Sequence, residues 1–173
     1  MKTDLPEARS KKLENAYLCT PKYLIHNLYF TIYNLQNMYP EAIVIPMKKE
    51  LVDVGFEDLT TPTAVDAAIN TKGTVLVVVN SVCGCAAGAA RPGIKLAVQN
   101  EKKPGKLTAV FAGFDTEATA QARKHFAPYP PSSPAIALFK DGKLVHFIER
   151  HHIEGRSAQA IAENLKMAFD EFC

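Results

Sequence analysis

The distribution of hydrophobic positions predicts one sheet in the part of the chain that follows residue 41. Residues 74–80 read Thr-Val-Leu-Val-Val-Val-Asn, an unbroken and mostly β-branched run that is typical of a central strand covered on both faces. Residues 106–114 form a second, mostly apolar run, which we interpret as a parallel neighbour of that strand. Residues 56–59 are long enough only for a short edge strand.

Helical periodicity separates these strands. In residues 41–54 the apolar positions recur near helical spacing and Gly55 supplies a C-terminal stop, which requires Pro46 to lie in the first turn. Thr61 and Pro62 have the residue types of an N-cap and of a first helical residue. Further helices are predicted over residues 62–69, 85–99, 116–126 and 157–172, the last of which is amphipathic.

The C-terminal part of the chain has the pattern of a β-hairpin. Residues 135–139 and 144–148 are apolar runs on either side of Asp141-Gly142, a dipeptide that favours a tight turn. The resulting order is β-α-β-α-β-α-β-β-α, with the last strand pair antiparallel to the others. We therefore predict an α/β fold, a three-layer α/β/α sandwich with a mixed central sheet and a C-terminal hairpin plus helix. This is the element order of a thioredoxin-like domain.

Residues 1–37 differ in character from the remainder, because a charged opening gives way to an aromatic tract. We interpret residues 1–37 as an N-terminal extension, partly helical or irregular, and residues 38–173 as the thioredoxin-like domain. The alternative is a helix packed on the domain surface. The most hydrophobic stretch near the N-terminus, residues 23–35, is interrupted by polar residues, so we expect neither a signal peptide nor a membrane span.

Composition narrows the class of protein. The 173 residues are 47% hydrophobic and 22% charged, which suffices for one ordinary core and is short for two. The net charge is only +2 and no long run of lysine or arginine occurs, so we expect small or neutral partners and no nucleic acid. The four cysteines are widely and unevenly spaced, unlike those of small secreted domains, which favours a reducing, cytoplasmic compartment.

Cys83-Gly84-Cys85 follows the predicted central strand directly and opens the next helix, where an α/β sheet has its ligand crevice. Free N–H groups and the helix dipole lower the pKa of a cysteine at a helix start from about 8.5 to roughly 3.5–7.5. Residues at this spacing can bridge in a turn, and Gly84 relieves the steric limit between them. We therefore predict a redox-active disulfide, with Cys83 as the more exposed and more acidic thiol.

The alternatives for this cysteine pair are inert packing and half of a metal site. A metal site calls for further Cys or His ligands at suitable spacing. His125, His151 and His152 are the nearest by sequence, and they do not form a recognisable zinc pattern. We therefore predict no metal and no other bound cofactor.

Four other residues have weaker claims to a role. Pro92 predicts a kink in the helix that the cysteine pair opens. Gly88 either allows close helix packing or is a tolerated small residue, and the second interpretation is slightly favoured. Cys173, the last residue, is more easily explained as a bystander than as a third redox thiol, and Cys19 has a still weaker claim.

A proline-rich segment before the hairpin supplies the second half of the predicted site. Ser132-Ser133-Pro134 leads into the first hairpin strand, at the point where thioredoxin-like folds place a cis-proline facing the active-site cysteines. A cis X–Pro bond costs only about 0.5–1 kcal/mol relative to trans. Such a turn presents backbone polar groups to an extended thiol substrate, so we predict that Gly84, Ser133 and Pro134 bind substrate.

A basic cluster follows the second hairpin strand, which returns to the same end of the sheet. Its members include Arg150, His151 and Arg156. We predict that these residues attract a carboxylate-bearing thiol or stabilise the Cys83 thiolate. The alternative is a solvated strand end.

Residues 38–173 resemble the bacilliredoxins, and the Cys-Gly-Cys-Ala segment continuing to Arg91-Pro92 is the most specific part of the similarity. The segments that carry it are Tyr39-Pro-Glu-Ala, Asn80-Ser-Val-Cys-Gly-Cys-Ala-Ala-Gly-Ala-Ala-Arg-Pro-Gly93, Pro131-Ser-Ser-Pro134 and Ile153-Glu-Gly155. The resemblance implies a thioredoxin-like enzyme that removes bacillithiol from mixed disulfides on protein cysteines. Its partners would be bacillithiolated proteins and the low-molecular-weight thiol. Carried over by position, Cys83 attacks the mixed disulfide and takes up bacillithiol, and Cys85 is the resolving thiol.

Three other functions remain open at this point. The same pair can serve another low-molecular-weight thiol, or act as a general disulfide reductase or isomerase. A third possibility is a thioredoxin-like scaffold that binds a metal through Cys83 and Cys85. The missing Cys-X-X-Cys spacing and the lack of tryptophan weigh against a general thioredoxin-type reductase.

Overall fold

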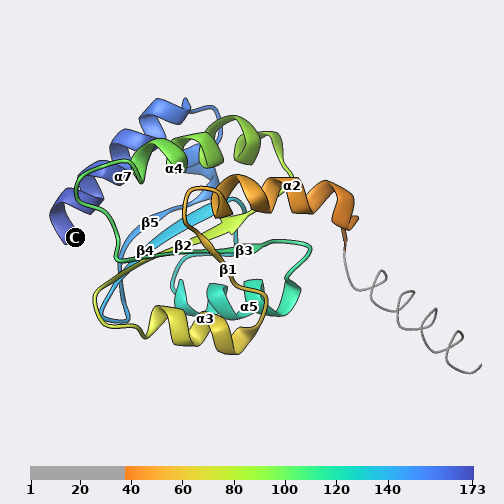
Figure 1. Ribbon diagram of the computed structural model, residues 1–173, viewed down its shortest axis with the longest axis horizontal. Helices are drawn as coiled ribbons and strands as arrows, with labels where there is room; N and C mark the ends of the chain where they lie inside the picture. The colour runs from red at the N-terminus through yellow and green to blue at the C-terminus, as the bar shows by residue number, and fades with distance from the viewer. Residues whose placement is uncertain (1–37) are drawn as a thin grey trace, which may run out of the picture. The chain divides into compact units, whose positions relative to one another are not determined.

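A five-stranded sheet with the order β1-β3-β2-β4-β5 forms the middle layer of the computed structural model, which describes residues 38–173 (Figure 1). The predicted extension, residues 1–37, and Cys19 lie outside the described residues, so the domain division stays a prediction. The strands are β1 (Glu57–Asp58), β2 (Thr74–Asn80), β3 (Lys106–Phe111), β4 (Ala135–Lys140) and β5 (Lys143–Ile148). The predicted α/β fold and mixed sheet are confirmed.

The strand directions correct one prediction. β3 pairs in parallel with β1 and with β2, whereas β4 pairs antiparallel with both β2 and β5. β4 is therefore the reversed strand, and β5 runs in the direction of β2. The prediction that the whole hairpin opposes the other strands is wrong for β5, because the two strands of a hairpin oppose each other.

Helices cover both faces of the sheet (Figure 1). One face carries α2 (Glu41–Val52), α4 (Arg91–Ala97) and α7 (Ala158–Phe172), and the other carries α3 (Pro62–Ile69) and α5 (Thr116–His125). A π-helical turn, η1 (Ala86–Ala90), precedes α4, and a short helix, α6 (Arg150–Ile153), follows β5. No helix within residues 38–173 is long and apolar enough to cross a membrane.

β2 separates two hydrophobic clusters, which explains why its sequence shows no polar alternation. Leu76 and Val78 belong to the cluster beneath α2, α4 and α7. Val75, Val77 and Val79 belong to the cluster beneath α3 and α5. All five are at most 1% exposed, as expected of a strand with both faces covered.

Several element boundaries follow from the chemistry of the side chains beside them, and those at Thr61 and at Asp141-Gly142 were predicted. Thr61 Oγ1 accepts a hydrogen bond from the Ala64 N–H at the start of α3. Ser157 caps α7 in the same way. Asp141 and Gly142 have φ values of +49° and +76°, as a two-residue type I′ turn requires.

The structure corrects the placement of Pro46 and the course of the helix after the cysteines. Pro46 lies in the interior of α2 and not in its first turn. It is exposed, so the carbonyl that lacks a helical partner faces water, while α2 packs through its opposite side. The helix predicted over residues 85–99 is present but not uniform, because η1 and α4 follow each other without a break. Pro92 therefore lies inside a helical segment, directly after the π turn.

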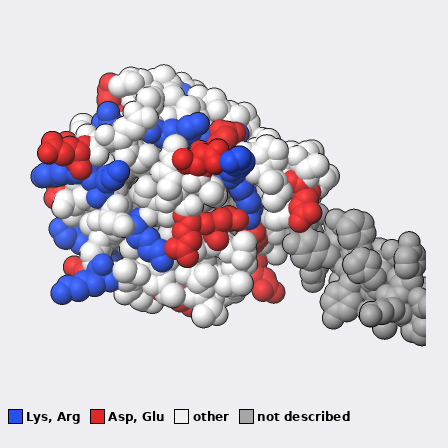
Figure 2. Space-filling model, in the orientation of Figure 1, with Lys and Arg blue, Asp and Glu red and all other residues white. Residues whose placement is uncertain are grey.

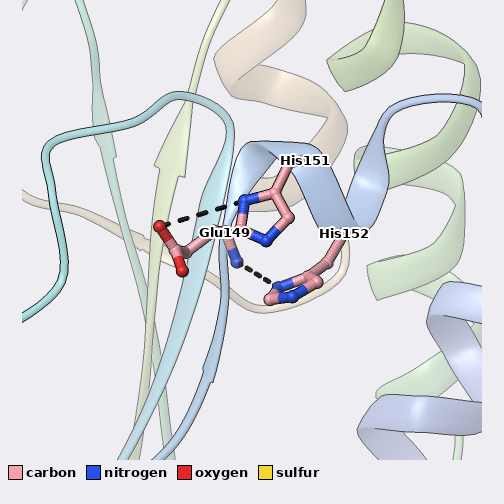
Figure 3. A group of neighbouring side chains, drawn as sticks. All are labelled: Glu149, His151 and His152. Carbon is pink, nitrogen blue, oxygen red and sulfur yellow. Dashed lines mark hydrogen bonds and ion pairs between the residues drawn. The ribbon is translucent and has the colours of Figure 1, made fainter.

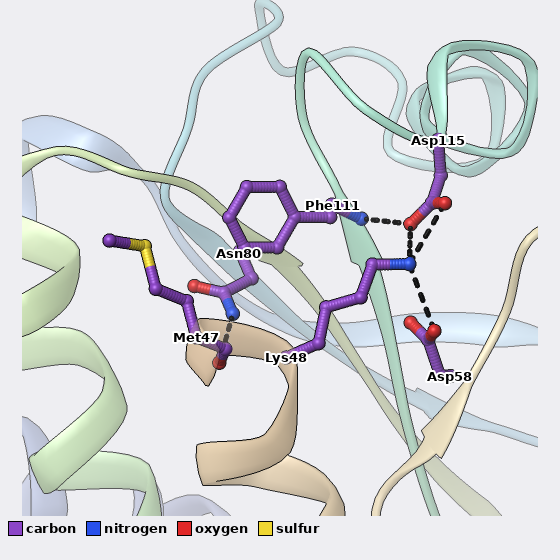
Figure 4. A network of polar contacts seen from close by, with 6 residues as sticks. All are labelled: Met47, Lys48, Asp58, Asn80, Phe111 and Asp115. Atoms are coloured by element: carbon purple, nitrogen blue, oxygen red, sulfur yellow. Dashed lines mark hydrogen bonds and ion pairs between the residues drawn. The ribbon is translucent and has the colours of Figure 1, made fainter. Parts of the chain in front are cut away.

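Helix α2 is tied to the sheet by a buried lysine. Lys48 Nζ lies 2.9 Å from Asp58 Oδ2 and 2.7 Å from Asp115 Oδ2 (Figure 4). Burial raises the pKa of the Asp115 carboxyl, although Lys48 acts in the opposite direction. Asn80 Nδ2, at the end of β2, donates to the carbonyl oxygen of Met47 over 3.2 Å. These contacts hold α2 against the carboxyl ends of β1 and β2.

Acidic and basic side chains are interspersed on the face of the molecule shown in Figure 2. This mixed surface agrees with the small net charge of the sequence. The expected absence of a nucleic-acid partner stays a prediction.

Candidate active site

The two cysteines lie together just beyond the carboxyl end of β2. Their sulfur atoms are 2.6 Å apart, both residues are half-buried, and Gly84 between them is exposed. Cys83 was predicted to be the more exposed thiol, but the two fall in the same half-buried range. The position at the end of the central strand, ahead of a helical segment, agrees with the prediction.

Hydrogen-bond donors converge on Cys83. Ser81 Oγ lies 3.2 Å from the Cys83 sulfur, and the Ala86 N–H donates to it over 3.4 Å. Burial raises the pKa of the Cys83 thiol, but the hydrogen bonds from Cys85, Ser81 and Ala86 outweigh it. The charge of Arg150 acts in the same direction, so the pKa of Cys83 lies below its ordinary value. Cys83 is the more acidic thiol, as predicted.

Cys85 has the opposite shift. Burial raises the pKa of the Cys85 thiol, and so do its hydrogen bond to Cys83 and the negative charge on Cys83. At a pH between the two pKa values, Cys83 is a thiolate that accepts a hydrogen bond from the Cys85 thiol. The pair therefore contains one nucleophile and one protonated neighbour.

Ser81 and Ala86 were missed by the sequence analysis. The signal for Ala86 was present, because a helical segment that opens after a cysteine offers free N–H groups to its sulfur. The signal for Ser81 was weaker. A hydroxyl two residues before a cysteine reaches the sulfur only if the chain turns between them, and the sequence does not specify that turn.

The proline loop reaches the same end of the sheet as the cysteines. The Ser133–Pro134 peptide bond is cis, as predicted, and a second cis bond, Ala127–Pro128, was not predicted. Ala135, the residue after Pro134, pairs with Val79 of β2. Pro134 therefore lies beside the end of the strand that leads to the cysteines.

Arg150 connects the basic cluster to this loop. Its N–H donates to Ser132 Oγ and its Nη1 donates to the carbonyl oxygen of Ser133, each over 3.3 Å. A hydrogen bond with Glu154 and the negative charges of Cys85, Glu154 and Cys83 raise the pKa of Arg150, so it stays cationic. The structure thus brings Arg150 close to the cysteine pair.

The basic cluster was predicted to lie at the end of the second hairpin strand, but part of it lies in a short helix. Residues 150–153 form helix α6, because Glu149 and His152 cap each other's backbone N–H groups. His151 and Arg156 are exposed. Within residues 38–173, neither of these two side chains has a recorded contact with either thiol, and their proposed roles stay predictions.

Glu149, His151 and His152 bring possible metal-ligand atoms within 4.8 Å of one another (Figure 3). Helix capping explains this arrangement. His152 Nδ1 accepts a hydrogen bond from the Glu149 N–H over 3.3 Å, which places the proton of the neutral ring on Nε2. Neither nitrogen of His152 then offers a free lone pair to a metal ion.

A groove of about 470 Å³ lies beside α6, between β5 and α7. Its walls combine apolar side chains with imidazole, amide and guanidinium groups, which suits a polar ligand with an anionic group. The lining residues are His146, Phe147, Ile148, His152, Arg156, Ala160, Ile161 and Asn164.

Comparison with known proteins assigns the chain to a family. A family model described as disulphide isomerase matches residues 39–173. The bacilliredoxin of Cytophaga hutchinsonii is 61% identical over 134 residues, which are 78% of this chain and 99% of that protein. The bacilliredoxin of Koribacter versatilis is 52% identical over 137 residues, covering 79% of this chain and 94% of that one.

Among solved structures, the thioredoxin of Malassezia sympodialis matches 68% of this chain and 90% of its own, with a TM-score of 0.50 and 12% sequence identity. This likeness shows the fold alone. The sequence identity to the two bacilliredoxins shows the family as well as the fold, since it extends over nearly the whole length of both proteins. The chain therefore belongs to the bacilliredoxin family.

Proposed function

We propose that this protein removes bacillithiol, or a similar low-molecular-weight thiol, from mixed disulfides on protein cysteines. Family and fold support a thiol–disulfide oxidoreductase in general, and the particular substrate is our proposal. One observation carries it: the donors around the cysteine pair converge on Cys83, which makes it the stronger nucleophile of two adjacent thiols. The reaction needs a reducing compartment, so we place the protein in the cytoplasm.

In the first step, the Cys83 thiolate attacks the bacillithiol sulfur of the mixed disulfide. A new S–S bond joins Cys83 to bacillithiol, and the old S–S bond breaks. The substrate cysteine leaves as a thiolate and takes a proton from water. Arg150 favours the thiolate of Cys83 through its positive charge.

In the second step, Cys85 attacks the Cys83 sulfur and bacillithiol leaves as a thiol. Its proton comes from the Cys85 thiol, directly or through water. Once Cys83 is part of a disulfide it carries no charge, so one of the causes that raise the pKa of Cys85 disappears. The two sulfur atoms lie next to each other, which favours this second attack. Two electrons from further thiols then return the Cys83–Cys85 disulfide to the dithiol.

The loop before β4 is suited to hold the substrate in line with Cys83. Ala135, the residue after Pro134, pairs with Val79 near the end of β2, and Arg150, whose charge acts on both thiols, donates to the Ser133 carbonyl. The groove beside α6 has space and charge for the polar part of a carboxylate-bearing thiol, and Arg156 and His152 line it. We assign substrate binding to Gly84, Ser133, Pro134, Arg150, His151 and Arg156.

A disulfide isomerase is the second candidate, and the description of the matching family model favours it. An isomerase uses the same attack by Cys83 but releases the substrate through a different substrate thiol. Attack by Cys85 then only releases substrates that stay bound to Cys83 as a mixed disulfide, and it is not an obligatory step. The two functions consequently differ in their dependence on Cys85.

Mass spectrometry tests the proposal. Reduced protein is mixed with a bacillithiolated protein, and Cys85→Ala is used to trap the first intermediate. We expect a bacillithiol adduct on Cys83 in Cys85→Ala, no adduct in Cys83→Ala, and a Cys83–Cys85 disulfide with free bacillithiol in the parent. The same substrate carrying glutathione tests the identity of the thiol.

Three outcomes would contradict parts of the proposal. Equal rates with glutathione and bacillithiol would remove the preference for bacillithiol. Reactivation of a scrambled disulfide protein by Cys85→Ala, without removal of bacillithiol, would favour the isomerase. No adduct on Cys83, together with tightly bound zinc in the purified protein, would favour a metal-binding scaffold.

A further inference from the structure

Arg91, the first residue of α4, is a buried cation that has no part in the reaction described above. It is 2% exposed, and a guanidinium in such a place must be paired and hydrogen-bonded. Its Nε lies 3.0 Å from Glu50 Oε2, a carboxylate of α2. The π turn η1 lies between the cysteines and Arg91.

The remaining contacts of Arg91 go to the two residues at the end of β2. Its Nη1 donates to Asn80 Oδ1 over 3.2 Å and to the carbonyl oxygen of Ser81 over 3.0 Å. Asn80 Oδ1 also accepts the N–H of Ser81 over 2.8 Å. Ser81 is therefore held from both sides of its backbone, with its N–H on Asn80 and its carbonyl on Arg91.

This arrangement orients the Ser81 side chain. Ser81 is 6% exposed, and its Oγ lies 3.2 Å from the Cys83 sulfur. When Cys83 is a thiolate, the hydroxyl donates its proton to the sulfur, and such a hydrogen bond to a charged acceptor depends strongly on distance and direction. The position of the Ser81 backbone thus determines how well this donor serves Cys83.

We propose that Arg91 is a positioning residue for Cys83. By fixing Asn80 and Ser81, it keeps the Ser81 hydroxyl against the Cys83 sulfur and so favours the attacking thiolate. The inference rests on the proposed role of Cys83 as the attacking thiol. It also gives a role to the Arg91-Pro92 part of the motif, which the reaction steps leave unused.

Arg91 acts through these hydrogen bonds more than through its charge, because Glu50 lies beside the guanidinium and offsets it. A lysine at this position keeps the charge, but its single ammonium nitrogen cannot lie against Glu50 and also reach the two acceptors at the end of β2, as Nε and Nη1 of Arg91 do together. Arg91→Lys is therefore the informative substitution. Arg123→Lys, at a half-buried arginine of α5 on the other face of the sheet, is the matched control.

The measurement is the rate of alkylation of Cys83 by iodoacetamide against pH, followed by peptide mass spectrometry. All variants carry Cys85→Ser, whose hydroxyl keeps a donor beside Cys83. We expect Ser81→Ala to slow alkylation near neutral pH by about tenfold, the value of one hydrogen bond to a charged group. Arg91→Lys should slow it by a large part of that factor, and Arg123→Lys should leave it unchanged.

A double variant separates positioning from a general loss of structure. If Arg91 acts through Ser81, Arg91→Lys has no further effect once Ser81→Ala is present. The inference would be overturned if the double variant slowed alkylation by the product of the two single factors, or if Arg91→Lys alone left the alkylation rate unchanged. Where Arg91→Lys does not fold, Asn80→Ala removes the other support of Ser81 and must behave in the same way.

The pH dependence of Cys83 alkylation in the parent protein distinguishes a failure of the proposed function from a failure of the positioning role. Alkylation of Cys83 that begins only near the ordinary pKa of a cysteine would contradict the proposed role of Cys83 itself. Alkylation at lower pH that does not depend on Arg91 would contradict only the positioning role.

Discussion

Arg150 donates a hydrogen bond from Nη1 to the carbonyl oxygen of Ser133, the residue that precedes the cis-proline Pro134. Helix α6 and the proline loop are therefore joined beside the cysteine pair. The same side chain places a positive charge close enough to favour the thiolate form of Cys83. Arg150 thus combines two functions that a single substitution removes together.

Arg150→Ala is expected to slow alkylation of Cys83 near neutral pH by about two- to threefold at low ionic strength. The effect is small because Arg150 is exposed and water screens its charge. The difference from the parent should shrink further in about 1 M salt, where the Debye length is about 3 Å. His151→Ala is the control, because His151 is an exposed neighbour that faces Glu149. An equal loss in both variants would contradict a specific role for Arg150.

The two active-site thiols are expected to titrate in a fixed order. The pKa of Cys83 lies below that of an ordinary cysteine and the pKa of Cys85 lies above it, so alkylation of the reduced parent should reach Cys83 first as pH rises. Since folding depresses the pKa of Cys83, its thiolate stabilises the fold at a pH above the pKa of the unfolded cysteine, and this stabilisation is lost as pH falls through the pKa of the folded state. Site-resolved mass spectrometry checks the order, and modification of Cys85 at the lower pH would reverse the assignment.

Local patterns in the sequence were enough to locate the cysteine pair and the proline loop. The bounds predicted for the central strand, residues 74–80, are those of β2, because a β-branched run covered on both faces has few other structures available. The strand entry after Ser133 singled out Pro134 among the prolines, whereas its cis bond was expected from the thioredoxin-like element order. These features depend on residues that are neighbours along the chain.

Local patterns in the sequence did not predict the contacts that surround the cysteine pair. Arg91 and Ser81 are ten positions apart with a π turn between them, and hydrophobic spacing reveals neither the turn nor the contact. Lys48 and Asp115 are 67 positions apart, and a lysine in an amphipathic pattern is ordinarily placed on the solvent side. Helix α6 was missed because reciprocal capping by two side chains, and not periodicity, defines it.

Two glycines in the helical segment after the cysteines should respond differently to alanine. A Cβ on Gly93 would lie 2.8 Å from both the Ala158 carbonyl oxygen and Ile161 Cβ of α7, whereas a Cβ on Gly88 meets nothing within 4 Å. The close-packing interpretation therefore belongs to Gly93 and is wrong for Gly88. Gly93→Ala should lower the free energy of unfolding by about 1–3 kcal/mol. Gly88→Ala should stay within about 1 kcal/mol of the parent.

Urea denaturation of both glycine variants gives this comparison. The slope of the unfolding free energy against urea should be unchanged, so that the midpoints report stability. Similar midpoints for the two variants would show that α4 and α7 can separate by a few tenths of an ångström without loss.

Lys48 and Lys49 are adjacent on α2, and only the first is buried against acidic partners. The Lys48 side chain is 9% exposed, and it faces the Asp115 carboxylate, which is 5% exposed. Lys49 pairs with Asp53 on the surface, and both side chains are more than half exposed. Lys48→Ala leaves a buried carboxylate without its cation and should lower the free energy of unfolding by about 3–5 kcal/mol. Lys49→Ala should lower it by less than about 1 kcal/mol.

The pH dependence identifies Asp115 as the cause of that loss. Burial raises the pKa of Asp115 above 3.8, so this carboxyl favours the fold when protonated, and that contribution is lost as pH rises through its folded pKa. Without Lys48 the pKa rises further, and the loss in Lys48→Ala should be smaller at about pH 4.5 than at pH 7. Adding Asp115→Asn to Lys48→Ala should recover stability at pH 7, since a neutral amide needs no counter-charge. A loss that does not change with pH, or that Asp115→Asn fails to reduce, would assign the effect to the packing of the lysine stem alone.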